Sequence, residues 1–226
     1  MPATLSIVGT PIGNLEDISL RALRVLKEAT LILCEDTRVT RKLLDRYQIK
    51  TKTLSYHQHS SVSRVDEILQ LMRAGKSIAL VTDAGMPTIS DHGGGLINYT
   101  RALIDPSVKV EIVPGPTALS TAVAFSGIIM KSFLFLGFLS HKKGRQTALK
   151  EIAKSPRAVI VYESSHRIEK LLTEAKTHFP SRKIVITKEL TKIHEELLTG
   201  TAEELLLILT EHPEKKKGEF VVIITP

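Results

Sequence analysis

The feature that most constrains this chain is its near-continuous alternation of short, β-branched apolar runs with stretches of helical spacing. The stretches between the runs place apolar residues on one helix face, as Val39, Leu43 and Tyr47 do. Buried strands separated by amphipathic helices indicate an α/β fold whose sheet is largely parallel, at least in the first half of the chain. The predicted strands cover residues 4–9, 31–35, 78–82, 110–113, 133–138, 158–162, 183–187 and 220–225.

The strand–helix rhythm is interrupted at VPGPTA, residues 113–118, where Gly115 and Pro116 suit the cap and first turn of a helix. A chain of 226 residues holds one or two domains. The net charge is +7, and most of the positive excess follows this interruption. We therefore expect two α/β domains of similar size, residues 1–114 and 115–226.

Composition excludes some classes of protein and favours one kind of partner. The longest apolar stretches are far shorter than the ~20 residues that span a bilayer, so no membrane segment is expected. The N-terminus has no basic region followed by an apolar one, and the single cysteine, Cys34, cannot form an internal disulfide. These features predict a cytoplasmic protein. The basic charge makes nucleic acid a plausible partner.

Four predicted strands end in loops with an unusual content of glycine, proline and charge. These loops are GTPIGNLED (residues 9–17), CEDTR (34–38), TDAGMPTISDHGGG (82–95) and PGPTA (114–118). Ligands of open α/β sheets bind beyond the carboxyl ends of the strands, so we expect a binding site there. Neither the P-loop pattern nor the G-x-G-x-x-G dinucleotide pattern occurs. The ligand should therefore be held by backbone groups that these loops expose.

Two other kinds of chemistry have weak support. His57 and His59 are one residue apart, which places both on one face of a strand, but two histidines alone make a poor metal site. We predict no metal. Ser164, Ser165 and His166 are adjacent in YESSHR, but no nucleophile elbow is present.

Eight ordered motifs together resemble the small-subunit ribosomal RNA methyltransferase I family, one of the tetrapyrrole-methylase-like enzymes that use S-adenosyl-L-methionine. The motifs are TPIGNLEDISLRAL, CEDTR..RKLL, SYHQH, TDAGMPTISD, PGPTAL, FLFLGFL, YESSHR and TKELTKIHEELLTGT. The resemblance covers essentially the whole chain. It implies two α/β domains with the cofactor in the cleft between them, usually in a homodimer. It also implies 2′-O-methylation of a cytidine ribose in the decoding region of 16S rRNA, with rRNA or the 30S subunit as partner.

The resemblance also implies the residues that would contact the cofactor. Most come from the loops of the first domain, and three close over the adenosine from the second. They are Pro11, Asp83, Gly85, Met86, Pro87, Ile89, Ser90, Thr117, Ala118, Tyr162, Thr187 and Glu219.

The polar motifs are where we place RNA binding and chemistry. The candidates for substrate contact are Arg38, Arg41, His57, His59, Arg167, Lys142, Lys143 and Arg145, of which the last three suit a solvated surface equally well. Methyl transfer needs chiefly in-line positioning of the ribose oxygen, with a general base as an aid. The possible bases are Asp36, Glu163, Lys188 and Glu189. We favour Lys188, with Glu189 as its orienting partner; a lysine serves only where burial lowers its pKa.

Two other functions stay open. A corrin or porphyrin methylase is the nearest alternative within the superfamily, although the polar motifs and the basic second domain disfavour it. A non-catalytic protein that binds RNA or the ribosome on the same fold is the other. Its support is the DHGGG segment, residues 91–95, where the family usually has a Pro-Gly-Tyr sequence in place of His92, Gly93 and Gly94.

Overall fold

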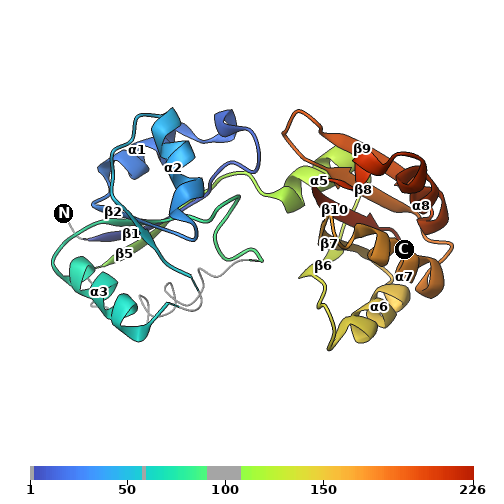
Figure 1. The fold of residues 1–226 in the computed structure, drawn as a ribbon. Coiled ribbons are helices and arrows are strands. Elements are labelled where there is room, and N and C mark those ends of the chain that lie inside the picture. The colour runs from blue at the N-terminus through green and yellow to red at the C-terminus, as the bar shows by residue number, and fades with distance from the viewer. Residues whose placement is uncertain (1–2, 58–59, 91–107) are drawn as a thin grey trace. The chain divides into compact units, whose positions relative to one another are not determined.

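The chain folds into two compact α/β units, Met1–Thr117 and Ala118–Pro226 (Figure 1). The structure is a computed structural model, and it describes residues 3–57, 60–90 and 108–226. The predicted α/β class is confirmed. Each unit has its own sheet and its own core, and the two are described in turn.

The first unit is built on a five-stranded parallel sheet of order β3-β2-β4-β1-β5. Because all the strands run the same way, their carboxyl ends lie on one edge of the sheet. The strands are β1 (Thr4–Val8), β2 (Leu31–Cys34), β3 (Thr53–Ser55), β4 (Ile78–Leu80) and β5 (Lys109–Val113). The helices are η1 (Leu15–Asp17), α1 (Leu20–Glu28), α2 (Thr37–Arg46) and α3 (Val62–Arg73).

Both faces of this sheet are covered by helices, α1 and α2 on one and α3 on the other (Figure 1). Strand β2 illustrates the two-residue period of a doubly buried strand. Ile32 and Cys34 pack with α1 and α2, whereas Leu33 packs with α3. Burial raises the pKa of the Cys34 thiol.

The helices of the first unit begin at polar side chains that accept backbone N–H groups. Ser19 caps α1, Asp36 caps α2 and Ser61 caps α3. Each cap follows a strand or a loop directly, so the chain turns into its next helix at a fixed residue. Asp36 therefore has a structural duty besides any chemical one.

The second unit is built on a mixed sheet of order β6-β7-β10-β8-β9. Strand β10 runs antiparallel to both β7 and β8, so β6, β7 and β8 share one direction and end at the edge where β10 begins. The strands are β6 (Phe133–Phe138), β7 (Ala158–Ser164), β8 (Ile184–Lys188), β9 (Glu196–Gly200) and β10 (Glu219–Ile224). The helices are α5 (Ala118–Ser126), α6 (Arg145–Lys154), α7 (Ile168–His178), α8 (Ala202–Glu211) and η2 (Pro213–Lys216).

The core of the second unit lies between its sheet and helices α6, α7 and α8. Val161, Ile186 and Val222 face this core. Helix α5 lies against β8 and β10 and is not part of that cluster. The two faces of this sheet therefore have different coverings, which matters for the side chains at its edge.

The apolar runs located eight of the ten strands that the described residues form and missed β3 and β9. β3 has only three residues, none of them buried. β9 reads Glu-Leu-Leu-Thr-Gly, which lacks both β-branched apolar residues and a buried face. Within the described ranges, no helix has the length and apolar character needed to cross a membrane.

Candidate active site

The carboxyl edge of the first unit gathers the loops that follow β1, β2, β4 and β5. Two of these loops are paired through their backbones. The Thr10 N–H donates to the Gly85 carbonyl at 2.9 Å, and the Gly85 N–H donates to the Thr10 carbonyl at 3.1 Å. The buried Thr10 hydroxyl donates to the Thr82 carbonyl at 3.1 Å. Loops far apart in sequence thus form one fixed surface.

Two glycines allow the loops after β1 and β5 to touch. A Cβ built on Gly9 would lie 2.6 Å from both the Gly115 nitrogen and the Met86 sulfur, closer than real Cβ contacts come. A Cβ on Gly115 would lie 2.9 Å from the Gly9 backbone. The Gly115 N–H donates to the Met86 sulfur at 3.3 Å. Met86, a predicted cofactor contact, therefore also fills the space beside these glycines.

Asp83 joins the loops after β2 and β4, because its carboxylate accepts the Asp36 N–H at 3.0 Å. The Asp36 carboxylate in turn forms an ion pair of 2.6 Å with Arg38. This hydrogen-bonded arginine lowers the pKa of Asp36 from 3.8 to about 2. Asp36 is consequently ionised at neutral pH and is a weak base. Its predicted catalytic role thus has little chemical support, whereas its capping role is evident.

The segment after β4 is strained where cofactor contacts were predicted. Thr88 and Ser90 have φ angles of +79° and +59°, and Gly85 has +85°. Left-handed backbone at residues other than glycine is costly and concentrates at functional sites. Pro87 is buried, as is Pro11, and Ile89 is 38% exposed. The segment therefore offers apolar side chains on a backbone with left-handed turns.

The remaining predicted residues of the first unit lie near the same edge. Arg41 donates to the Thr53 hydroxyl at 3.3 Å. The His57 N–H, which follows β3, donates to the Ser60 hydroxyl at 2.9 Å. His59 and the DHGGG segment lie outside the described residues.

In the second unit, Tyr162 and Thr187 lie on one face of the sheet, on either side of Val221 in β10. The phenol oxygen of Tyr162 accepts the Leu119 N–H at 3.1 Å, in the first turn of α5 and next to Ala118. Burial raises the pKa of Tyr162, so the phenol stays protonated. Three predicted cofactor contacts, Ala118, Tyr162 and Thr187, thus share the α5 side of the sheet.

Lys188 and Glu163 lie on the opposite face, on either side of Phe220. Side chains alternate along a strand, which separates Lys188 from Thr187 and Glu163 from Tyr162. Lys188 is 6% exposed, and its ammonium makes no hydrogen bond with a described residue. It lines a pocket of about 550 Å³ with Glu189, His194, Glu195, Glu196, Glu214, Lys215, Lys217 and Gly218.

The sequence suggested that Glu189 orients Lys188, but no hydrogen bond joins these two side chains in the structure. The Glu189 carboxylate instead accepts the Glu219 N–H at 2.9 Å and the Lys192 ammonium at 3.0 Å. Burial alone would raise the pKa of Glu189, but these hydrogen bonds prevail and lower it. Lys192 also donates to the Glu219 carboxylate at 2.9 Å. The Lys192 ammonium thus bridges the carboxylates of Glu189 and Glu219. Glu219 is a predicted cofactor contact.

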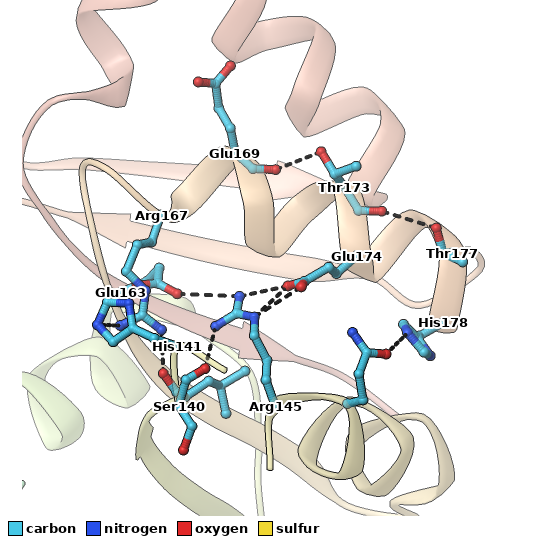
Figure 2. Close-up of polar contacts among 12 residues, drawn as sticks. Ser140, His141, Arg145, Glu163, Arg167, Glu169, Thr173, Glu174, Thr177 and His178 are labelled. Carbon is cyan, nitrogen blue, oxygen red and sulfur yellow. Dashed lines mark hydrogen bonds and ion pairs between the residues drawn. The ribbon is translucent and has the colours of Figure 1, made fainter. Parts of the chain in front are cut away.

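Of the basic residues predicted to contact substrate here, two are exposed and two are not. Lys142 and Lys143 are exposed in the loop between β6 and α6. Arg145 is only 3% exposed and forms a 2.7 Å ion pair with Glu174 (Figure 2). Arg167 is also engaged, with Glu163 at 3.2 Å. The surface location expected for Arg145 is therefore wrong, because the cluster that holds its guanidinium is internal.

Sequence reasoning missed the part played by Gly9 and by Lys192. Both lie in motifs that were recognised, but a glycine needed for a close approach looks like any turn glycine. Among the described lysines, Lys192 is distinguished by pairing with two carboxylates, those of Glu189 and Glu219. Within the described ranges, no three His, Cys, Asp or Glu residues are grouped so that they could hold a metal ion.

Comparison with known families identifies the class of protein. Residues 4–206 match the model of the Tetrapyrrole (Corrin/Porphyrin) Methylases, and the chain belongs to this family. It is a methyltransferase. Solved structures share the fold at low identity. The cobalamin biosynthetic enzyme cobalt precorrin-4 methyltransferase has a TM-score of 0.72 at 20% identity, covering 98% of this chain and 94% of that one. Uroporphyrin-III C-methyltransferase from Thermus thermophilus, solved with S-adenosyl homocysteine, has a TM-score of 0.63 at 20% identity, covering 98% and 96%.

The curated relatives are more specific. "Ribosomal RNA small subunit methyltransferase I" of Thermotoga maritima is 44% identical, over 98% of this chain and 97% of its own length. The protein of the same name from Xylella fastidiosa is 44% identical, over 99% and 81%. That from Bacillus subtilis is 39% identical, over 97% and 74%. The resemblance indicated by the eight motifs is thereby confirmed.

Proposed function

We propose that this methyltransferase transfers a methyl group from S-adenosyl-L-methionine to the 2′-hydroxyl of a cytidine in the decoding region of small-subunit rRNA. The observation that carries the proposal is the 44% identity, over 98% of the chain, to a protein named for small-subunit rRNA methylation. Corrin and porphyrin methylases share the fold at about 20% identity, which supports no common substrate.

The residues at the two sheet edges fit the cofactor chemically. Adenosine requires apolar surfaces with backbone groups beside them, and the segment containing Met86, Pro87 and Ile89, with its left-handed residues, supplies both. Carboxylates and a protonated phenol suit a sulfonium cation and ribose hydroxyls. Asp83 and Glu219 supply the carboxylates, and Tyr162 supplies the phenol. The full proposed set of contacts is Pro11, Asp83, Gly85, Met86, Pro87, Ile89, Ser90, Thr117, Ala118, Tyr162, Thr187 and Glu219.

The chain's main chemical task is positioning. The cofactor supplies an already activated methyl group, so little covalent help is needed. The protein must hold the ribose oxygen in line and exclude competing water. A general base accelerates such a step by about 10²- to 10⁴-fold. We retain Lys188 as the candidate base, because it is buried at the end of β8 without a hydrogen-bond partner among the described residues.

The RNA contacts that we propose are exposed or partly exposed cations at the two edges. In the first unit these are Arg38 and Arg41, with His57 and His59 beside the extruded nucleotide. In the second unit they are Lys142 and Lys143. Arg167 and Arg145 instead donate to the backbone carbonyls of Leu139 and Ser140, just before these two lysines. In this proposal the protein acts in the cytoplasm on the 30S subunit. The resemblance also implies a homodimer, which light scattering tests.

The test incubates the purified chain with S-adenosyl-L-methionine labelled in the methyl group and small ribosomal subunits from cells that lack the activity. Primer extension at low nucleotide concentration then maps any 2′-O-methyl group. We expect one labelled decoding-region cytidine, and no label with Gly115→Leu, whose side chain cannot fit beside Gly9. Cofactor binding without any labelled rRNA would overturn the substrate assignment. Absence of both would favour a non-catalytic RNA-binding function.

A further inference from the structure

We propose that Glu163 is a positioning residue for RNA binding. Through Arg145 and Arg167 it fixes the loop of residues 140–144, and this loop presents Lys142 and Lys143 to backbone phosphates. The inference rests on the proposed function. Glu163 was one of the possible bases, but its side chain has no exposed surface with which to meet a ribose hydroxyl, and it is paired with Arg167. The inference therefore gives this buried charge cluster a role other than proton transfer.

The cluster is centred on a fully buried carboxylate. The Glu163 side chain has no exposed surface, and one of its oxygens accepts the Ser164 N–H at 2.9 Å and lies 3.2 Å from the Arg167 Nε. Its other oxygen lies 4.0 Å from Arg145 and accepts no hydrogen bond from a described residue. A buried ion pair of this kind contributes little net stability, because the loss of hydration offsets its attraction.

Both arginines form hydrogen bonds with the backbone at the start of the loop (Figure 2). Arg167 donates to the Leu139 carbonyl and lies 3.4 Å from the His141 ring nitrogen. Arg145 donates to the Ser140 carbonyl at 3.3 Å. Glu163 thus pairs with the Arg167 guanidinium and lies 4.0 Å from that of Arg145, and each arginine donates to one backbone carbonyl at the start of the loop. The buried carboxylate therefore orients the arginines, and the arginines in turn position the backbone at the start of the loop.

Arg145 also fixes the end of the loop. It is the first residue of α6, its own N–H donates to the Lys142 carbonyl at 3.3 Å, and Gly144 before it has a φ of +87°. Its side chain therefore returns to the point where the loop begins. Glu174 of α7 holds the same guanidinium by two hydrogen bonds of 2.8 and 3.0 Å. One buried residue, Arg145, therefore bonds both ends of the loop, the start through its side chain and the end through its backbone N–H.

The closed loop carries two exposed lysines. No described carboxylate lies within ion-pair distance of Lys142 or Lys143, whereas Lys176 and Lys216 each have one and Lys192 has two. The loop follows β6, beside the Tyr162 end of β7, where Phe138 pairs with Tyr162. Adjacent unpaired ammonium groups on a fixed loop at this edge suit a polyanionic backbone.

The test is a double-mutant cycle on the KM for small ribosomal subunits. Removal of both lysines, in Lys142→Ala/Lys143→Ala, should raise KM about 10-fold near 0.1 M salt and reduce the salt slope of binding by about 2. Glu163→Gln keeps the shape of the side chain but removes its charge. It should raise KM about 5-fold, with kcat and the affinity for S-adenosyl-L-methionine changed less than about 2-fold. In the double-alanine background, Glu163→Gln should add less than about 2-fold.

Leu209→Ala is the matched control. Leu209 is fully buried in the same core, on α8, so this variant weakens the unit without touching the charge cluster. It should leave KM unchanged. Should Glu163→Gln fail to fold, Glu174→Gln releases Arg145 while leaving Glu163 in place, and the same cycle applies. Equal effects of Leu209→Ala, or multiplicative effects in the combined variant, would overturn the positioning role.

Hydrogen exchange keeps this inference separate from the proposed function. Amides of residues 140–144 should exchange faster in Glu163→Gln than in wild type, with no such change in Leu209→Ala. Unchanged exchange in Glu163→Gln would overturn the inference, even for an enzyme that methylates rRNA. A wild-type chain that methylates no subunit would instead overturn the proposed function, because the cycle then has no KM to report.

Discussion

Gly9 and Gly115 touch through their backbones, so that a Cβ on either would lie within 3 Å of the other residue. The contact joins the loop after β1 to the loop after β5, and the Met86 sulfur closes its third side. The proposed cofactor surface of the first unit therefore depends on two positions without side chains.

Gly9→Ala tests this contact. The added methyl group forces the two loops apart, and overpacking of this kind costs about 1–3 kcal/mol in the free energy of unfolding. Because the displaced loops carry the proposed cofactor contacts, the affinity for S-adenosyl-L-methionine should fall as well. Calorimetry measures both. Val25→Ala, a core change on α1, is the control and should lower stability while leaving that affinity intact. Equal loss of affinity in both variants would contradict this role of Gly9.

Arg38→Gln tests the origin of the low Asp36 pKa. Without the guanidinium, the Asp36 pKa should rise from about 2 toward 3.8, as measured by carboxyl chemical shifts against pH. A carboxylate with a lowered pKa in the folded state stabilises the fold above its unfolded pKa. This contribution disappears as pH falls from about 4 through about 2. The melting temperatures of wild type and Arg38→Gln should therefore converge over that range. An unchanged Asp36 titration would assign the shift to the α2 cap instead.

Lys192→Met tests the bridge that the Lys192 ammonium forms between the carboxylates of Glu189 and Glu219. Loss of the ammonium should raise the Glu189 pKa toward its ordinary value of 4.5 and release the Glu219 carboxylate. Freeing a proposed cofactor contact should weaken binding of S-adenosyl-L-methionine about 5-fold, which corresponds to about 1 kcal/mol.

Lys176→Met is the control for that variant. Lys176 belongs to an exposed ion pair with Glu203, away from the sheet edge. It should leave cofactor affinity as in wild type. Glu189 adds a pH dependence, since its lowered pKa stabilises the fold above pH 4.5 and this stabilisation is lost as pH falls through the folded pKa. If Lys192→Met and Lys176→Met bind the cofactor equally well, the bridge between Glu189 and Glu219 has only a structural role.

The sequence predicted the fold better than it predicted the neighbours of each side chain. Local patterns located most strands, and the placement of strand-end loops followed from the α/β class, because parallel strands share a carboxyl edge. Which charges are internal could not be predicted. Lys142, Lys143 and Arg145 form one basic run in sequence, yet only Arg145 is buried. The difference arises because α6 begins at Arg145, and its side chain meets Glu174 of α7, which is 29 residues away.

The motif Thr187-Lys188 illustrates the same limit at a single strand. Adjacent residues in a motif suggest a common site, but β8 continues to Lys188, so the two side chains point to opposite faces of the sheet. This alternation separates two functions that the motif had joined. Cofactor affinity and the rate of the chemical step should therefore respond to different substitutions.

Thr187→Val and Lys188→Met test that separation. Thr187→Val preserves the buried shape and removes the hydroxyl on the α5 side, so it should weaken the binding of S-adenosyl-L-methionine. Lys188→Met removes an ammonium on the opposite face and should leave this affinity within about 2-fold. If Lys188 is the base, Lys188→Met should lower the single-turnover rate about 100-fold or more. Rapid-quench measurement at saturating cofactor and enzyme gives this rate without product release. A Lys188→Met rate equal to that of wild type would exclude Lys188 as the base and leave positioning of the ribose hydroxyl as the chain's contribution to methyl transfer.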